Sequence, residues 1–392
     1  MNLVSFGQSP SGRVVRVGRG EVEYRAFVPH PLPPDLTLTP DLLMQLSQAD
    51  QALGKLAGFS SMMANSQLLL RPFIHREAVL SSRIEGTQTG LTDLYAYEAG
   101  QVASPHIAVP NEQDANEVLN YVRALDYGLE RLATLPISLR FVRELHEKLM
   151  RGVRGDQATP GEFRHSQNWI GPPGSTLNTA TFVPPPPPDM LDALDAFEKY
   201  LHRPAEYPAL IRLAFVHYQF EAIHPFLDGN GRVGRLILPL LLVHWDLLPV
   251  PLLNLSAYFE RHRDRYYDLL LAVSQHGVWD EWVAFFLQAF TEQANDAIQR
   301  AAALLSLQKQ WRDQFTQARS SVLLLRLIDH LFEWPILTIT DTAGYLGVTY
   351  KSAQANINKL VQAEILQSSS QVYNRAFVAT AVLRVIQDDP GV

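Results

Sequence analysis

The 392-residue sequence contains no cysteine. The chain therefore forms no disulfide, has no thiolate nucleophile and offers no Cys ligand to zinc. This composition fits a reducing compartment, and the cytoplasm is the location that we expect. A hydrophobic fraction of 47% and a charged fraction of 19% are typical of a globular protein, and the length allows two or three domains.

Long apolar runs are also absent. The longest, residues 236–243, is interrupted by Pro239 and is far shorter than the roughly 20 residues that a membrane span needs. Residues 1–25 contain four arginines but lack the apolar region of a signal peptide. We therefore expect neither a secretory signal nor a membrane anchor. The net charge of −7 provides no general attraction to nucleic acid.

One twelve-residue stretch, HPFLDGNGRVGR at residues 224–235, concentrates a histidine, a carboxylate, three glycines and two arginines. Apolar segments with helical spacing flank it at residues 209–223 and 236–248. This pattern predicts a tight loop between two buried helices, the second beginning near Arg232. Free N–H groups at a helix N-terminus, glycines that allow close approach and two guanidinium groups together predict a polyphosphate site.

Two other phosphate or metal motifs do not fit this stretch. Residues 229–234 match G-x-G-x-x-G, but a dinucleotide site needs a preceding strand inside a βαβ unit, and a helical segment precedes this pattern. A calcium loop is excluded because Asp228 has no oxygen ligands at alternate positions.

The stretch resembles the signature of the Fic (Fic/Doc) family, H-x-F-x-[DE]-G-N-G-R-x-x-R, at every fixed position. The resemblance implies a protein adenylyltransferase, which transfers AMP from ATP to a Ser, Thr or Tyr hydroxyl of a target protein or of itself. His224 would be the catalytic base, because an imidazole titrates near neutrality. Asp228 would hold Mg²⁺ together with the nucleotide phosphates. Phe226 would anchor the loop in the core.

The resemblance also implies the residues that bind ATP. The N–H groups of two glycines and the Asn230 amide would form an anion hole, Arg232 would hold the β-phosphate and Arg235 the γ-phosphate. Tyr266 would lie beside the adenosine, although His262 stands where the family often has Asn. The expected ATP-binding residues are Glu85, His224, Gly229, Asn230, Gly231, Arg232, Val233, Gly234, Arg235 and Tyr266.

The segment SSRIEG at residues 81–86 resembles the inhibitory helix of Fic proteins, [ST]-x-x-x-E-[GN]. Ser81 and Glu85 are four residues apart and share one helix face, and Gly86 is a suitable helix stop. The implied role of Glu85 is to pair with Arg235 and to block the γ-phosphate site. An isolated Ser/Glu pair on a solvated helix end is the alternative.

Residues 167–183 contain two β-like pieces around a Pro/Gly/Ser/Thr/Asn-rich loop, which predicts a hairpin. It resembles the flap beside the Fic active site, where Trp169, Ile170 and Gly171 would dock the target backbone. A packed surface loop is the alternative. Five prolines, 184–188, end the hairpin, and Asp189 is expected to begin a helix over 190–201.

The expected fold is mainly α: residues 1–110 form an arm and the inhibitory helix, 111–312 the Fic catalytic domain with its β-hairpin flap, and 321–392 a winged helix-turn-helix module. The arm contains strands over 14–17 and 22–27. Helices are predicted at 41–57, 68–85, 111–132, 137–150, 322–332, 339–346 and 350–362, and β-like pieces at 365–367 and 376–378.

The C-terminal segment leaves a second function open, a DNA-binding regulator. Its 321–392 stretch has five Lys/Arg against six Asp/Glu, which is too few for the basic face of a typical DNA-binding domain. The 350–362 helix nevertheless offers Lys351, Gln354, Asn356, Asn358 and Lys359. A third hypothesis keeps the fold and changes the chemistry to AMP removal or to transfer from another nucleotide. A homodimer is a further expectation from the resemblance.

Overall fold

The computed structural model describes residues 3–20, 23–62, 67–103, 112–153, 159–317, 322–369 and 376–387. Val22 and Asn111, which the sequence placed at the starts of a strand and a helix, lie outside these ranges. Among the described helices, none combines the length and the apolar character that a membrane crossing requires.

The chain is mainly helical, which confirms the predicted fold class. The helices are α1 (Leu3–Phe6), α2 (Pro40–Met62), α3 (Gln67–Ile84), α4 (Leu91–Ala103), α5 (Glu112–Arg131), α6 (Leu139–Met150), α7 (Pro187–His202), α8 (Ala209–Ile223), α9 (Asn230–His244), α10 (Leu255–Arg261), α11 (Arg263–His276), α12 (Trp279–Gln317), α13 (Val322–Glu333), α14 (Ile339–Leu346), α15 (Tyr350–Gln362) and α16 (Thr380–Gln387). The strands are β1 (Gly12–Val17), β2 (Tyr24–Pro29), β3 (Ile336–Leu337), β4 (Gln367–Ser369) and β5 (Ala376–Val378).

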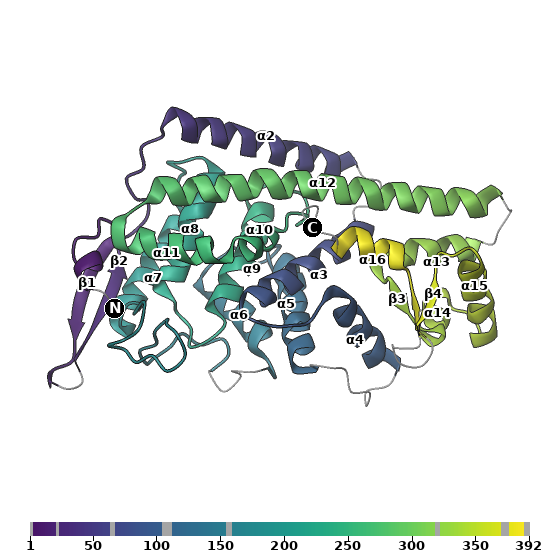
Figure 1. The fold of residues 1–392 in the computed structure, drawn as a ribbon, viewed down its shortest axis with the longest axis horizontal. Helices are drawn as coiled ribbons and strands as arrows, with labels where there is room; N and C mark the ends of the chain where they lie inside the picture. The colour runs from purple at the N-terminus through teal and green to yellow at the C-terminus, as the bar shows by residue number, and fades with distance from the viewer. Residues whose placement is uncertain are drawn as a thin grey trace.

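Two long helices, α2 and α12, pack side by side along one edge of the molecule (Figure 1). The antiparallel β1–β2 hairpin lies at one end, with Gly12 opposite Pro29, and α13–α16 lie at the other (Figure 1). Helices α3, α5, α6, α8 and α9 fill the space between these ends. The catalytic-signature stretch lies in this central layer.

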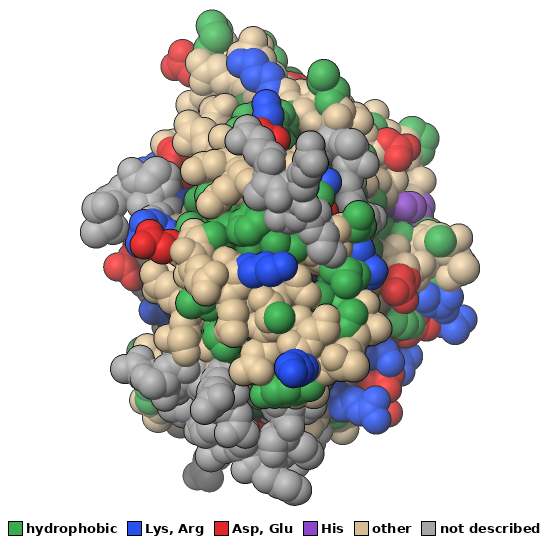
Figure 2. Space-filling view, turned by 90° about the vertical axis from the view of Figure 1, so that its right-hand side faces the viewer, with side chains coloured by type: hydrophobic (Ala, Val, Ile, Leu, Met, Phe, Trp, Pro, Cys, Tyr) green, Lys and Arg blue, Asp and Glu red, His purple; other side chains and the backbone are tan. Residues whose placement is uncertain are grey.

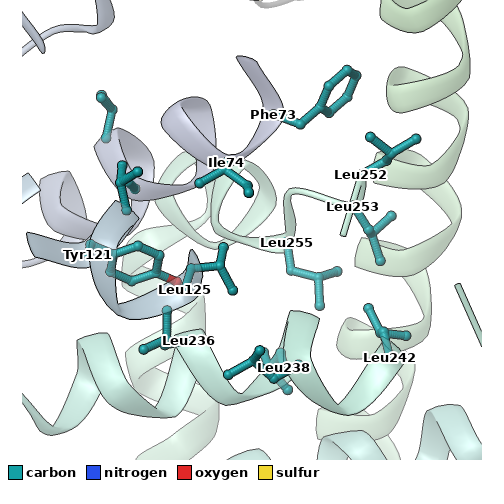
Figure 3. Packing of buried hydrophobic residues seen from close by; sticks show 14 of the residues in the cluster. Phe73, Ile74, Tyr121, Leu125, Leu236, Leu238, Leu242, Leu252, Leu253 and Leu255 are labelled. Carbon is teal, nitrogen blue, oxygen red and sulfur yellow. The ribbon is translucent and has the colours of Figure 1, made fainter. Parts of the chain in front are cut away.

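Helix α9 is buried on all sides, because its residues are apolar at nearly every position after the two arginines. Leucines of α9 contact side chains of α3, α5 and the segment before α10 (Figure 3). The side chains labelled there are Phe73, Ile74, Tyr121, Leu125, Leu236, Leu238, Leu242, Leu252, Leu253 and Leu255. This packing fixes the position of the α9 N-terminus, where the signature stretch ends.

Two expectations about the flap region are corrected. The predicted hairpin is reduced to one antiparallel bridge, in which Ile170 and Phe182 exchange both backbone hydrogen bonds at 2.8 and 3.0 Å. Helix α7 begins at Pro187 rather than after Asp189. Proline fits the first helical turn because the N–H that it lacks has no intrahelical partner there.

The C-terminal unit, residues 322–387, contains α13–α16 and a three-stranded sheet of order β3-β5-β4. The predicted bounds of α14 and α15 are confirmed. Thr338 and Asp341 form a capping box at the start of α14, and Gly347 ends that helix in the left-handed conformation, with φ 68°. The unit packs on α3 and α4 through α13, α14 and α16.

The end of the molecule that carries this unit has no continuous basic surface over its described residues. Figure 2 shows Lys and Arg standing singly or beside Asp and Glu on that face. Asn356, expected on the solvent side of α15, is 7% exposed and donates its amide to the Ser352 carbonyl at 2.9 Å. Its side chain is therefore unavailable to a partner.

Candidate functional site

The signature loop connects α8 to α9 through two left-handed residues. His224 ends α8 with φ 51°, and Gly229 precedes α9 with φ 76°. The Asn230 side chain closes the loop, accepting from Phe226 N–H and donating to Phe226 C=O at 2.8 Å each. The Asn230 side chain thus uses its Oδ1 and one of its two Nδ2 protons inside the loop. Its place in an anion hole stays a prediction.

Phe226 is fully buried, as expected of a loop anchor. Its ring stacks on His146 of α6, with centroids 3.7 Å apart. The His146 ring also donates from Nε2 to the Asp228 carbonyl at 3.1 Å, and its Nδ1 accepts Gly161 N–H at 2.9 Å. Sequence reasoning missed His146, since a histidine on an amphipathic helix carries no signal of a contact with a loop 82 residues away.

His224 has the arrangement of a base. Its Nδ1 lies 3.3 Å from the Glu221 carbonyl, and a carbonyl only accepts, so Nδ1 carries the proton and Nε2 is the acceptor. Burial lowers the pKa of His224 to about 4, with the Arg164 guanidinium contributing. The imidazole is therefore neutral at pH 7 and able to take a proton.

Asp228 is the exposed carboxylate of the loop. Its side chain is 51% accessible, its Oδ1 accepts the Gly229 N–H at 2.6 Å, and it lies 3.8 Å from Arg232. Within the described ranges no cluster of three or more His, Asp or Glu side chains forms a ready-made metal site. Asp228 can supply one hard oxygen ligand, which fits a cation that is shared with nucleotide phosphates.

Both arginines of the signature are buried. Arg232 lies 3.4 Å from Glu117 of α5 and contacts Met150. Arg235, 1% exposed, donates from Nε to Ser81 Oγ at 2.9 Å and from Nη2 to Ser81 C=O at 3.1 Å. Nη2 also donates to Glu85 Oε1 at 2.6 Å.

The Glu85 carboxylate lies over the first turn of α9. A Cβ on Gly231 would overlap Glu85 Oε1, so only glycine permits the carboxylate to approach this closely. Burial alone would raise the pKa of Glu85, but the Arg235 guanidinium outweighs it and the pKa lies below its ordinary value. The structure thus brings Ser81, Glu85, Gly231 and Arg235 together, from segments about 150 residues apart.

A buried polar layer beneath Arg235 was not foreseen. Glu221 lies one turn before His224, its Oε1 has no hydrogen-bond partner, and a Cβ on Gly234 would overlap it. Burial raises the pKa of Glu221 to about 7, against the attraction of Arg235. The i, i+3 spacing to His224 was the only available signal.

Tyr266 belongs to this layer. It is fully buried, and its hydroxyl is 2.8 Å from His217 Nε2. Its ring packs against Phe259 and Tyr267, and its expected place beside the adenosine stays a prediction. Its neighbour Tyr267 is 39% exposed and has a pKa raised to about 12 by burial and by Glu85.

The flap segment lies against the signature loop and exposes the residues that the sequence predicts to dock a target. Trp169 and Ile170 are 43% and 41% exposed, and the Trp169 indole donates to the Ser175 carbonyl at 3.0 Å. Asn168 donates to the Phe226 carbonyl at 2.8 Å. The exposed edge formed by Trp169, Ile170 and Gly171 therefore adjoins the loop that carries His224.

Comparisons with known proteins agree with this geometry. Residues 43–130 match the Fic/DOC family N-terminal domain, and residues 136–242 match the Fic/DOC family domain. The chain belongs to the Fic/DOC family. The signature loop and residues 81–86 of this Fic protein both lie inside the matched regions.

Curated relatives include proteins named protein adenylyltransferase Fic. The one from Drosophila persimilis is 28% identical over 216 residues, which are 52% of this chain and 39% of the relative. The one from Aedes aegypti is 32% identical over 200 residues, 49% and 35% of the two chains. This chain thus spans less than half the length of these relatives.

Solved structures share the fold. A Fic family protein from Desulfovibrio desulfuricans aligns with a TM-score of 0.57 at 21% identity, covering 89% of this chain and 98% of that chain. Fic-1 from C. elegans aligns with a TM-score of 0.50 at 17% identity, covering 68% and 73%. At these identities the likeness concerns the fold.

Proposed function

We propose that this Fic protein is an adenylyltransferase that moves AMP from ATP to a Ser, Thr or Tyr hydroxyl of a protein. The observation that carries the proposal is a neutral His224 whose Nδ1 is hydrogen-bonded and whose Nε2 can accept a proton. This histidine precedes the N-terminus of α9, and two buried arginines lie in the first turns of that helix. The names of the curated relatives support the same activity.

The proposed chemistry follows from these groups. The target hydroxyl gives its proton to His224 Nε2 while its oxygen forms a bond to the α-phosphorus. The bond from that phosphorus to the bridging oxygen breaks, and pyrophosphate leaves. Arg232 and Arg235 stabilise the β- and γ-phosphates, and the N–H groups at the start of α9 stabilise the negative charge. Mg²⁺, held by Asp228, would neutralise phosphate charge.

We further propose that Glu85 inhibits the enzyme. Its carboxylate uses the guanidinium that the γ-phosphate needs, and it lies above the N-terminal turn of α9, where an anion would bind. A charge-assisted contact of 2.6 Å to a buried arginine is strong enough to compete with a phosphate. Displacement of Glu85 would then allow ATP to bind with its α-phosphorus in line with the acceptor.

The experiment measures incorporation of label from α-³²P-ATP with Mg²⁺ into protein. Wild type, Glu85→Gly and Glu85→Gly/His224→Ala are compared. We expect strong labelling in Glu85→Gly, weak labelling in wild type and none in the double variant. If no variant transfers label to protein or releases AMP, the adenylyltransferase proposal is wrong.

Two other functions are kept as alternatives. AMP removal would use Glu85 to position a water, and it would appear as release of AMP from a labelled protein by wild type but not by Glu85→Gly.

DNA binding by the C-terminal unit is disfavoured by the burial of Asn356 and by the scattered charges in Figure 2. A salt-sensitive gel shift that is lost in Lys351→Ala would favour it. A cytoplasmic homodimer remains part of the proposal and is tested by localisation and by sedimentation.

A further inference from the structure

Arg164 is a buried arginine beside the signature loop that the proposed chemistry does not use. Its side chain is 1% exposed. Within the described part of the chain, no carboxylate lies within ion-pair distance of it. Burial without a carboxylate lowers the pKa of Arg164 to about 10. Burying an unneutralised guanidinium is costly unless its donors are satisfied, so its contacts must offset that cost.

All donors of Arg164 that have partners contact backbone carbonyls, and these come from three segments. Nε donates to His224 C=O at 3.0 Å, Nη1 to Ser166 C=O at 3.1 Å and Nη2 to Pro185 C=O at 2.5 Å. The Arg164 backbone N–H donates to Pro225 C=O at 2.9 Å. The planar Arg164 guanidinium therefore joins His224, the proposed base, to both ends of the flap.

The flap, residues 167–183, is anchored to β2, where Phe27 N–H donates to the Val183 carbonyl at 2.8 Å. The Gln167 amide also joins its two ends, donating to the Pro184 carbonyl at 2.9 Å. The two sides of the flap are paired at the single Ile170–Phe182 bridge.

Toward the signature loop, Asn168 donates to the Phe226 carbonyl at 2.8 Å and to the His224 carbonyl at 3.5 Å. Within the described residues, the hydrogen bonds that join this segment to the signature loop are therefore those of Arg164 and Asn168, and Arg164 is the more buried of the two.

We infer that Arg164 is a positioning residue that sets the flap relative to His224, and so determines whether AMP is passed to a protein hydroxyl or to water. This inference rests on the proposed function. With either acceptor an oxygen bonds to the α-phosphorus, its proton goes to His224 and pyrophosphate leaves. A protein hydroxyl yields AMP-protein, and water yields free AMP. Water needs no docking edge, whereas a protein hydroxyl does.

The test uses Arg164→Lys in the Glu85→Gly background. Lysine keeps the positive charge but lacks the planar fork, so it cannot reach three carbonyls together. With α-³²P-ATP and the chain as its own acceptor, we expect the rate of protein labelling to fall about tenfold or more. KM for ATP should stay within about twofold, because the Arg164 side chain contacts carbonyls and neither of the two arginines proposed to bind the phosphates. The ratio of free AMP to AMP-protein should rise.

Arg143→Lys is the matched control. Arg143 also donates from Nε to a backbone carbonyl, that of Gly161, at 2.7 Å, but it is exposed and does not touch the signature loop. It should leave the ratio of free AMP to AMP-protein unchanged. Asn168→Ala is a second, milder variant and should shift the ratio in the same direction. An unchanged ratio in Arg164→Lys, or an equal shift in Arg143→Lys, overturns the inference.

Hydrogen exchange separates this inference from the proposed function. The Ile170 and Phe182 amides, which form the flap bridge, should exchange faster in Arg164→Lys than in Arg143→Lys at equal thermal midpoint. Unchanged exchange of these amides overturns the inference, whether or not AMP is transferred. Absence of both AMP and labelled protein in Glu85→Gly would reject the adenylyltransferase proposal. Faster exchange of the flap amides in Arg164→Lys would in that case still support the positioning role of Arg164.

Discussion

At the residue scale, His224 and Glu221 lie one turn apart and have pKa values shifted in opposite directions by the same cause. Burial disfavours the charged form of each, which lowers the pKa of the imidazole and raises that of the carboxyl. The uncharged form of each group is thus favoured. The buried Arg235 nearby is paired with Glu85. Each shift has a measurable consequence.

The first prediction concerns the pH dependence of AMP transfer. Because the pKa of His224 is about 4, the base is already deprotonated well below neutrality. Labelling by Glu85→Gly at saturating ATP should therefore be nearly constant from about pH 5.5 to 8 and fall only at lower pH. A loss of rate centred near pH 6.5, the ordinary value for histidine, would contradict this assignment.

The second prediction concerns stability. A carboxyl whose pKa rises to about 7 on folding holds its proton in the native state but loses it in the unfolded state above about pH 4.3. Stability is therefore fully present below that value and falls as the pH rises toward 7. Glu221→Gln should stabilise the protein by on the order of 1–3 kcal/mol at pH 8 and by much less at pH 5.

Urea unfolding at the two pH values measures this difference. The exposed Glu130→Gln on α5 is the control and should change stability little at either pH. Equal effects of Glu221→Gln at pH 5 and pH 8 would show that Glu221 does not titrate in this range.

At the scale of elements, the contact between α3 and α9 unites a serine and a carboxylate at the end of one helix with an arginine in the first turns of another. Ser81 and Ser82 are adjacent and both fully buried. Ser81 Oγ accepts from Arg235 at 2.9 Å, whereas Ser82 Oγ has no hydrogen-bond partner. The two serines therefore form a matched pair for testing what the contact contributes.

Ser81→Ala removes one hydrogen bond to a charged group, which contributes about 1.5–3 kcal/mol. The contact of Glu85 with Arg235 should weaken, because α3 then makes one hydrogen bond fewer to that arginine. Labelling should therefore lie between that of wild type and that of Glu85→Gly. Ser82→Ala should behave as wild type in the same α-³²P-ATP assay. Equal labelling by the two alanine variants would show that Ser81 does not support the Glu85 contact.

At the scale of the whole molecule, the C-terminal unit holds the start of the helix whose end precedes Glu85. The Arg71 guanidinium lies 3.7 Å from the ring centroid of Trp334 and 2.7 Å from Glu98 of α4. His75, fully buried, contacts the other oxygen of Glu98 at 2.8 Å. Helix α3 thus contacts the unit through Arg71 near its start and Arg235 of α9 through Ser81 near its end.

Trp334→Ala should loosen the unit from α3. Loss of the cation–π contact and of the partly buried ring should lower stability by about 1–3 kcal/mol. Amides of α3 should exchange faster in this variant. Tyr350→Ala, at a 54% exposed aromatic of the same unit, is the control and should change neither quantity. Unchanged exchange of α3 in Trp334→Ala would show that the unit does not restrain this helix.

The sequence by itself determined the local features of this protein. The signature loop, the helices on either side of it and the bounds of α14 and α15 follow from apolar periodicity, caps and glycine stops, which act between neighbours in the chain. The flap was foreseen less well, because β-like residues do not specify how many backbone pairs will form.

Only the tertiary structure decided which groups meet. Periodicity encodes which face of a helix is buried but not its partner, so the Arg235–Glu85 distance, the fork of Arg164 and the burial of Tyr266 came from packing alone. The same applies to Asn230, whose side-chain amide closes its own loop through two hydrogen bonds to Phe226. The chemistry of a side chain can be inferred from its type, but its use depends on neighbours that are distant in sequence.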